Sequence, residues 1–342
     1  MGPDRARVDR EGARFVRWAR VGDHVGVAAV DASEREWVPG WPISLARTMS
    51  PLRRGRGDPT LRIGPDEVWW ATRTPAGVAT LHLRLDRGTS TGGHSAGAVL
   101  ARAWGPGRQW AIDALPRTLG ADDDPTGFDR SANPVVTEAF DRFGATFRIL
   151  RTERVLESLV PAILEQRVTG QEARRSWRTL VTRFGEPAPG PTPNPMWVPP
   201  EAATWARVPS WEWHRAGVDP GRARSVQGVA LRAEALERLS ALPAAEAQRR
   251  MRSLPGIGVW TSAEVAMRAW GDADALPFGD FHLAKDVVWA LTGRRNGTDD
   301  ELAELLAPWA GHRLRAARVV LLAGGHQPSR GPRAAITDHR RR

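Results

Sequence analysis

The spacing of apolar residues divides the chain into a strand-rich part followed by a helix-rich part. Short β-type runs predict strands at 60–63, 68–74, 78–85 and 98–104, with a hairpin turn over 74–77. A helix is predicted at 109–119, packed on the sheet these strands form. Residues 25–30 are a further strand-like stretch within a charged and irregular beginning.

From residue 134 the apolar residues recur every three to four positions, which is typical of amphipathic helices. A proline-dense connector over 185–200 interrupts them and is expected to be extended. The predicted helices are 154–167, 171–184, 200–206, 210–216, 220–241, 244–253, 261–270, 281–291, 299–309 and 313–322.

The predicted fold class is therefore α+β, with an N-terminal antiparallel sheet and its helix followed by an all-helical domain. The turn Asp122-Asp123-Asp124-Pro125 is a plausible domain boundary. We interpret its three carboxylates as part of a solvated loop rather than as a metal site. We predict a charged extension at 1–40, an α+β domain at 41–130, a helical domain at 131–330 and a basic tail at 331–342.

The charge balance narrows the class of partner. The net charge is +10, which favours a polyanionic partner. Nucleic acid is favoured over a membrane surface as that partner. All basic residues except Lys285 are arginine, a bias that a GC-rich genome also produces. The absence of cysteine excludes disulfides, cysteine-ligated zinc and iron–sulfur clusters. Neither a membrane span nor a signal peptide is apparent, so we expect a cytoplasmic protein at the bacterial nucleoid.

The stretch Leu254-Pro255-Gly256-Ile257-Gly258 predicts a tight hairpin between two helices, because Pro255 cannot continue a helix and the glycines allow a sharp turn. Thr261 lies in the first turn of the next helix. Free N–H groups at such a helix start bind phosphate oxygens. The carboxylate of Asp280 follows that helix, where phosphate would repel it, and this suggests a chemical role.

At these residues the chain resembles the helix–hairpin–helix DNA glycosylases, and most closely the 3-methyladenine DNA glycosylase II branch in its actinobacterial form. The resemblance covers roughly residues 40–335 and is strongest from about residue 150. An ordered set of motifs carries it together with the hairpin: Ile163-Leu164-Glu165-Gln166-Arg167-Val168-Thr169, Gly279-Asp280-Phe281-His282-Leu283, Gly311-His312-Arg313 and Gly331-Pro332-Arg333.

The resemblance implies that Asp280 is catalytic. Breaking an N-glycosidic bond develops positive charge on the deoxyribose, and a nearby carboxylate stabilises it and orients the attacking water. The alternative is that Asp280 caps the helix predicted to open at Phe281. Both roles are compatible, because a cap position fixes the orientation of the carboxylate.

Trp260 stands where bifunctional relatives carry a lysine that forms a Schiff base, so the resemblance implies base release without strand nicking. With Phe281 and Leu321, Trp260 is assigned to the base pocket, where its indole would stack on an alkylated purine. Ordinary helix packing is the alternative for Trp260.

An enzyme of this class extrudes its base from the duplex, and something must fill the gap. The resemblance assigns this wedge to Arg167, although relatives often have an apolar residue there. Gln166 either contacts the orphaned strand or caps and packs. A monovalent cation at the carbonyls of Leu254 and Ile257 is also implied by the resemblance, with no other metal or cofactor.

The expected function is monofunctional excision of 3-methyladenine-type purines from duplex DNA, which starts base excision repair. Three alternatives stay open: a glycosylase for a deaminated or oxidised base, a non-catalytic protein that binds damaged DNA, and a structural helical protein with a genomic excess of arginine. We expect a monomer with damaged duplex DNA as its partner and no membrane association.

Overall fold

The structure is a computed structural model that describes residues 31–87 and 97–328. The chain from Asp31 onward forms one compact unit. The predicted strand at 25–30, the segment 88–96, the motif Gly331-Pro332-Arg333 and the tail at 331–342 lie outside the described residues.

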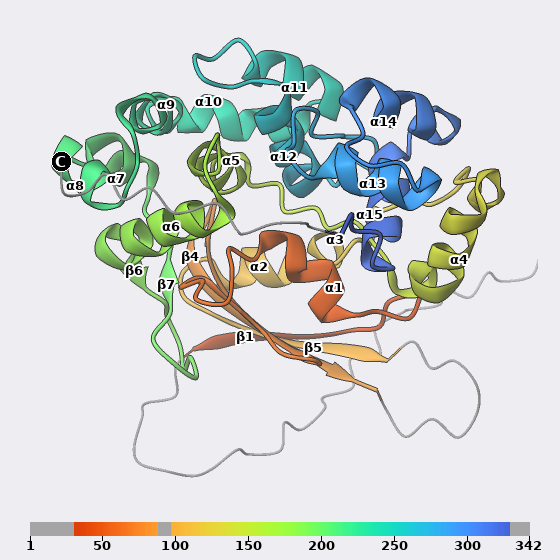
Figure 1. The fold of residues 1–342 in the computed structure, drawn as a ribbon. Coiled ribbons are helices and arrows are strands. Elements are labelled where there is room, and N and C mark those ends of the chain that lie inside the picture. Colours follow the sequence, from red (N-terminus) through yellow and green to blue (C-terminus); the bar gives the residue numbers. More distant parts are fainter. Residues whose placement is uncertain (1–30, 88–96, 329–342) are drawn as a thin grey trace, which may run out of the picture. The chain divides into compact units, whose positions relative to one another are not determined.

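The strand-rich part forms a five-stranded antiparallel sheet in the order β1-β5-β4-β3-β2. Strands β3 and β4 form the predicted hairpin, in which Thr74 pairs with Gly77 at the turn. Gly77 has a φ of 114°, which favours glycine. The strands are β1 (Ala32–Trp37), β2 (Leu61–Ile63), β3 (Glu67–Thr74), β4 (Gly77–Asp86) and β5 (Ala98–Trp104) (Figure 1).

Strand β1 corrects the predicted extension, because Ala32–Trp37 pairs along β5 and belongs to the sheet. Its sequence lacks apolar alternation, and Arg35 donates from Nη1 to the carbonyl of Ile112 at 3.3 Å. That carbonyl lies four residues before Pro116, which has no N–H to offer it. The same proline explains why the helix predicted at 109–119 is two helices, α2 (Arg108–Asp113) and α3 (Leu115–Thr118).

Helices α1 (Leu45–Met49) and α2 lie on one face of the sheet (Figure 1). Buried residues of the sheet and of α1, α2 and α3 form one apolar cluster, which includes Leu45, Met49, Val68, Leu81, Leu83 and Leu115. This burial on one face of an antiparallel sheet stabilises the strand-rich part.

The helix-rich part begins at α4, and the connector carries only the two-residue strands β6 (Glu186–Pro187) and β7 (Trp197–Val198). The helices are α4 (Pro134–Phe143), α5 (Val155–Leu164), α6 (Gly170–Phe184), α7 (Ala202–Arg207), α8 (Ser210–Arg215), α9 (Pro220–Ala230), α10 (Ala233–Glu237), α11 (Ala244–Met251), α12 (Val259–Ala269), α13 (Leu283–Thr292), α14 (Asp299–Leu306) and α15 (Arg313–Leu322).

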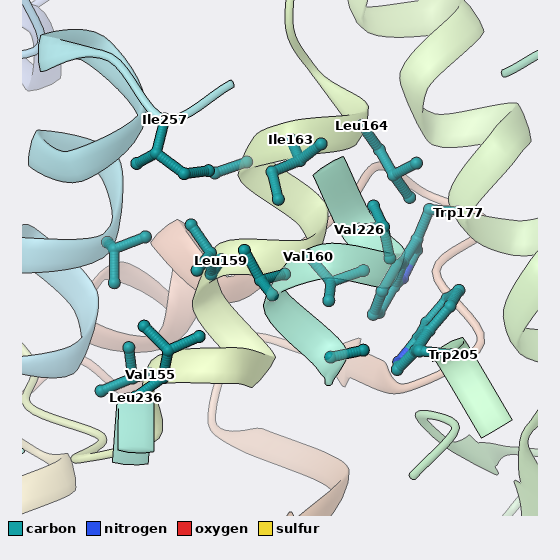
Figure 2. Packing of buried hydrophobic residues seen from close by; sticks show 14 of the residues in the cluster. Val155, Leu159, Val160, Ile163, Leu164, Trp177, Trp205, Val226, Leu236 and Ile257 are labelled. Carbon is teal, nitrogen blue, oxygen red and sulfur yellow. The ribbon is translucent and has the colours of Figure 1, made fainter. Parts of the chain in front are cut away.

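Helix α5 is the centre of the largest apolar cluster, shown in Figure 2. Side chains from several helices pack around it, including Trp177 of α6 and Trp205 of α7, whose rings stack with centroids 6.4 Å apart. Ile257, from the segment between α11 and α12, is 5% exposed and belongs to the same cluster. This loop is therefore anchored in the protein core.

The sheet and the helices are joined by buried polar contacts. The Glu157 carboxylate of α5 accepts hydrogen bonds from Thr72 Oγ1 at 2.7 Å and from the Arg73 N–H at 3.0 Å in β3. Trp177 Nε1 donates to Asp58 Oδ1 at 3.2 Å. The boundary predicted at residue 130 thus marks a change of secondary structure inside one compact unit. Among the described helices, none has the length and apolar character needed to cross a bilayer.

Candidate active site and nucleic-acid interface

The predicted hairpin connects α11 to α12 through a tight turn. Ile257 N–H donates to the Leu254 carbonyl at 3.1 Å, which closes the turn. Gly256 has a φ of 82°, and a Cβ there would collide with the Ser225 side chain. Both observations require glycine at this position. Pro255 and Gly256 are exposed, so the turn faces solvent while Ile257 is buried.

The start of α12 presents unpaired backbone donors. The first α-helical bond runs from Ser262 N–H to the Gly258 carbonyl, and the N-cap Gly258 has no side chain to cap the helix. Within the described chain no acceptor is recorded for the N–H groups of Gly258, Val259, Trp260 or Thr261. Such donors, together with the helix dipole, attract an anionic oxygen.

The Asp280 carboxylate is fixed by three neutral donors. Its Oδ1 accepts from the backbone N–H groups of His282 at 2.8 Å and Leu283 at 2.9 Å, and its Oδ2 accepts from Trp260 Nε1 at 3.1 Å. Helix α13 begins at Leu283, so the prediction that Phe281 opens the helix was wrong. Phe281 and His282 form a turn before the regular helix, and the Asp280 side chain caps the N–H groups two and three residues after it, as in the capping alternative.

The turn before Asp280 is stabilised by a hydrogen bond to Asp299, at the start of α14. Gly279 has a φ of 86°, and its N–H donates to Asp299 Oδ2 at 2.6 Å. The Asp280 N–H donates to the Pro277 carbonyl at 3.1 Å. The carboxylate is half-buried and lies beside the start of α12 through the Trp260 contact. A fixed negative group therefore stands next to exposed backbone donors.

Known proteins share sequence with this chain over part of its length. The chain is 31% identical over 180 residues to the probable bifunctional transcriptional activator/DNA repair enzyme AlkA of Mycobacterium tuberculosis, a match that covers 50% of this chain and 32% of that protein. The chain thus spans about a third of the length of the curated relatives it matches. No family model matches it.

Solved structures cover more of the fold. The 3-methyladenine DNA-glycosylase from Archaeoglobus fulgidus superposes with a TM-score of 0.69 at 17% identity, covering 85% of this chain and 98% of that one. The 8-oxoguanine glycosylase/lyase of Clostridium acetobutylicum superposes with a TM-score of 0.55 at 12% identity, covering 77% and 98%.

The chain has the fold of a helix–hairpin–helix DNA glycosylase. The predicted resemblance to the 3-methyladenine DNA glycosylase II branch and the α+β fold class are both confirmed. The residue roles inferred from that resemblance are proposals, which depend on where the fold places each side chain.

The three residues assigned to the base pocket have different surroundings. Trp260 packs against the cluster around α5, whereas Leu321 packs against a separate cluster formed by α13, α14 and α15. Phe281 is 71% exposed, and its ring lies 3.5 Å from the Nζ of Lys285. Trp260 is the one side chain of these three that is hydrogen-bonded to the Asp280 carboxylate.

Gln166 and Arg167 lie in the turn after α5, which ends at Leu164 rather than at the predicted residue 167. Gln166 Nε2 donates to the Gly256 carbonyl at 2.9 Å and to Thr261 Oγ1 at 2.8 Å. The side chain thus braces the hairpin, as in the packing alternative. Arg167 is exposed with a φ of 55°, beside Gln166 at the hairpin.

The proposed monovalent cation stays a prediction. The Leu254 carbonyl already accepts the turn hydrogen bond from Ile257 N–H. No cluster of three or more histidine or carboxylate side chains suited to a metal ion is found among the residues described.

Two groups near the site were not anticipated. Glu264 lies one helical turn after Trp260 on α12, is 7% exposed, and its Oε2 accepts from Arg268 Nη1 at 2.7 Å. Asp299 holds the N–H of Gly279 from the start of α14. The spacing of four residues from Trp260 places Glu264 on the same helix face, which is a readable signal. The contact of Asp299 with Gly279 joins residues far apart in sequence and has no such signal.

Proposed function

We propose that this chain is a DNA glycosylase that hydrolyses the N-glycosidic bond of a flipped, damaged base in duplex DNA. The arrangement of Asp280 carries the proposal. Its carboxylate is oriented by two backbone N–H groups and one indole N–H, none of which neutralises its charge. A carboxylate that keeps its charge stabilises the positive charge that develops on the sugar as the bond breaks.

The hairpin accounts for how the DNA strand is held beside the carboxylate. The N–H groups at the start of α12, for which no acceptor is recorded within the described chain, would bind a phosphate of the damaged strand. The Trp260 hydrogen bond then keeps the carboxylate close to that strand, where it faces the sugar of the extruded nucleotide. The similarity to AlkA and to the glycosylase structures supports DNA as the substrate.

We infer that base release occurs without strand cleavage. A lyase step needs an amine that attacks the sugar carbon, and Trp260 has none. The favoured substrate is an alkylated purine of the 3-methyladenine type. Its positive charge weakens the glycosidic bond, and the cationic ring stacks well on an indole. Repair of alkylated DNA is accordingly the proposed biological role.

A second substrate class follows from Glu264. This buried carboxylate lies one helical turn after Trp260 on the same helix face and is paired with Arg268. A hydrogen-bonding group beside the indole would favour a base with a polar edge, such as a deaminated or oxidised base, as the alternative substrate.

The test is release of free base from duplexes that carry 3-methyladenine, hypoxanthine or 8-oxoguanine, in single turnover. We expect release from the alkylated duplex and a loss of about 100- to 1000-fold in Asp280→Asn. Asparagine retains one oxygen for the cap of α13, so DNA binding should persist. Alkali-independent nicking by the wild type would contradict monofunctional action. Release from none of the three substrates, despite tight binding, would favour a non-catalytic DNA-binding protein.

A further inference from the structure

A group of arginines outside the hairpin has no carboxylate partner among the described residues. They are Arg53 and Arg56, in the loop after α1, and Arg174 and Arg178 on α6; we call these four the arginine surface. Ion pairs engage many other arginines of this chain, but none is recorded for these four within residues 31–87 and 97–328. Their guanidinium groups therefore carry charge that the described part of the fold does not neutralise.

The loop and the helix are fitted to one another. A Cβ at Gly55, whose φ is 84°, would collide with the aliphatic stem of Arg174. A Cβ at Gly57 would lie 2.5 Å from Nη1 of Arg178. The two side chains thus lie across a loop whose glycines leave room for them. This packing places the loop that carries Arg53 and Arg56 against the helix that carries Arg174 and Arg178.

The arginine surface is linked to the hairpin by two successive contacts. Arg54 Nη1, in the same loop, lies 3.4 Å from Glu165 Oε1 at the end of α5. The next residue, Gln166, donates to the Gly256 carbonyl of the hairpin. The loop that carries Arg53 and Arg56 is thereby held beside the α5–α6 turn, and that turn beside the hairpin.

A cavity of about 300 Å³ borders the loop. Its walls include Arg53, Arg56 and Arg62 and one acidic residue, Glu67, which accepts from Trp69 Nε1 at 3.1 Å and contacts His82 Nε2 at 2.6 Å. Three arginines against one carboxylate leave the cavity wall with a net positive charge, which extends the arginine surface.

We propose that the arginine surface binds the phosphodiester backbone of duplex DNA beyond the nucleotides held by the hairpin. The inference rests on the proposed function, in which the hairpin holds the damaged strand. Guanidinium groups bind phosphate oxygens through two parallel hydrogen bonds, and within the described chain these four have no ion pair to break before they do so. Contacts of this kind position the duplex and carry no sequence information.

The test compares Arg174→Gln/Arg178→Gln with the wild type in equilibrium binding to undamaged duplexes, one of about 12 and one of about 30 base pairs, from about 50 to 200 mM salt. We expect affinity for the longer duplex to fall about tenfold at low salt. The slope of log affinity against log salt should become shallower by about one for each phosphate that the variant no longer binds. The short duplex should bind both proteins alike.

Two further variants make the result specific. Arg53→Gln/Arg56→Gln removes the same charge from the other side of the surface and should reproduce the effect, which guards against a folding defect in α6. Arg232→Gln/Arg238→Gln removes two charges from the region of α10, where Arg238 pairs with Glu234, and should leave the slope unchanged. All proteins comprise residues 1–342.

Three outcomes would overturn the inference: an unchanged slope in both test variants, an equal loss in the α10 control, or an equal loss on the short duplex. Because binding is measured on undamaged DNA, a wild type that releases no base contradicts the proposed function alone. Conversely, normal base release with an unchanged slope contradicts only the arginine surface.

Discussion

Asp123, in the turn before α4, and Asp280, in the turn before α13, have opposite surroundings. Asp123 has a side chain only 2% exposed, and Arg315 donates to it at 2.5 Å from Nη2 and at 3.0 Å from Nη1. Its Oδ2 also accepts from the Ile149 N–H at 3.0 Å. Asp280 is half-buried, and its donors within the described chain are all neutral.

The contrast separates a structural carboxylate from one available for chemistry. The charge of Asp123 is compensated by a buried guanidinium, so its negative field is small outside the pair. The charge of Asp280 is oriented and left uncompensated, so it acts on whatever approaches it. An aspartate next to a turn is therefore interpreted from its donors: Asp123 was predicted to lie in a solvated loop, yet its side chain is buried against Arg315.

Of the substitutions that test this comparison, replacing Asp123 should have the largest effect, and that effect is a loss of folding stability. Asp123→Asn leaves Arg315 as a buried cation without its counterion, and we expect the free energy of unfolding to fall by about 3 to 5 kcal/mol. Urea denaturation measures this loss. Asp122→Asn is the matched control, because Asp122 pairs with Arg151 at 3.2 Å near the surface and should cost less than about 1 kcal/mol. Equal losses in the two variants would refute the structural role of Asp123.

A smaller effect is expected from Trp260→Phe, which keeps an aromatic ring but removes the N–H that orients Asp280. A hydrogen bond to a charged group contributes about 1.5 to 3 kcal/mol, so the single-turnover rate of base release should fall about ten- to a hundredfold. Trp270→Phe removes an indole N–H that donates to the Leu242 carbonyl at 2.9 Å and should leave this rate unchanged. A full rate in Trp260→Phe would show that the indole donor does not position the carboxylate.

The smallest effect concerns Glu237, another carboxylate whose hydrogen bonds come from backbone N–H groups. Its oxygens accept from the N–H groups of Val155 at 3.0 Å and Leu156 at 2.8 Å. Burial raises the pKa of Glu237 above its ordinary value, despite these hydrogen bonds. The folded chain consequently binds this proton more tightly than the unfolded chain does.

It follows that this group's contribution to stability is largest in acid and is lost as the pH rises through its raised pKa. In urea unfolding between about pH 4 and 7, the stability of the wild type relative to Glu237→Gln should fall with increasing pH, because only the wild type has to lose this proton. A wild type whose stability rises relative to the variant with pH would mean that the hydrogen bonds outweigh burial.

Much of the sheet was predictable because its inner face alternates cleanly. Strand β5 was found with its observed bounds, and the β3–β4 turn was recognised from Pro75 and Gly77. Strand β1 was missed because Glu34, Arg35 and Glu36 give no apolar alternation, and its inward arginine serves a carbonyl that only the fold brings near. Local pattern cannot report such a partner.

The site was predictable in its parts but not in its contacts. The resemblance indicated Asp280, Trp260 and the hairpin, but the hydrogen bond across 20 residues from Trp260 to Asp280 required the fold. Leu321 was grouped with Trp260, yet packs in another cluster. Gln166 had two alternatives, and its observed partners are both in or next to the hairpin. Pairings of this kind depend on tertiary packing, which periodicity does not encode.

The burial of Ile257 has a consequence for the affinity with which this protein binds a duplex. A loop that becomes ordered only on binding loses conformational entropy at that moment, and its affinity is lower by that amount. Here the loop is already immobilised, from below by Ile257 in the core and from the side by Gln166. The hairpin is thus pre-organised, and the entropy of fixing it is lost during folding rather than at each encounter with DNA.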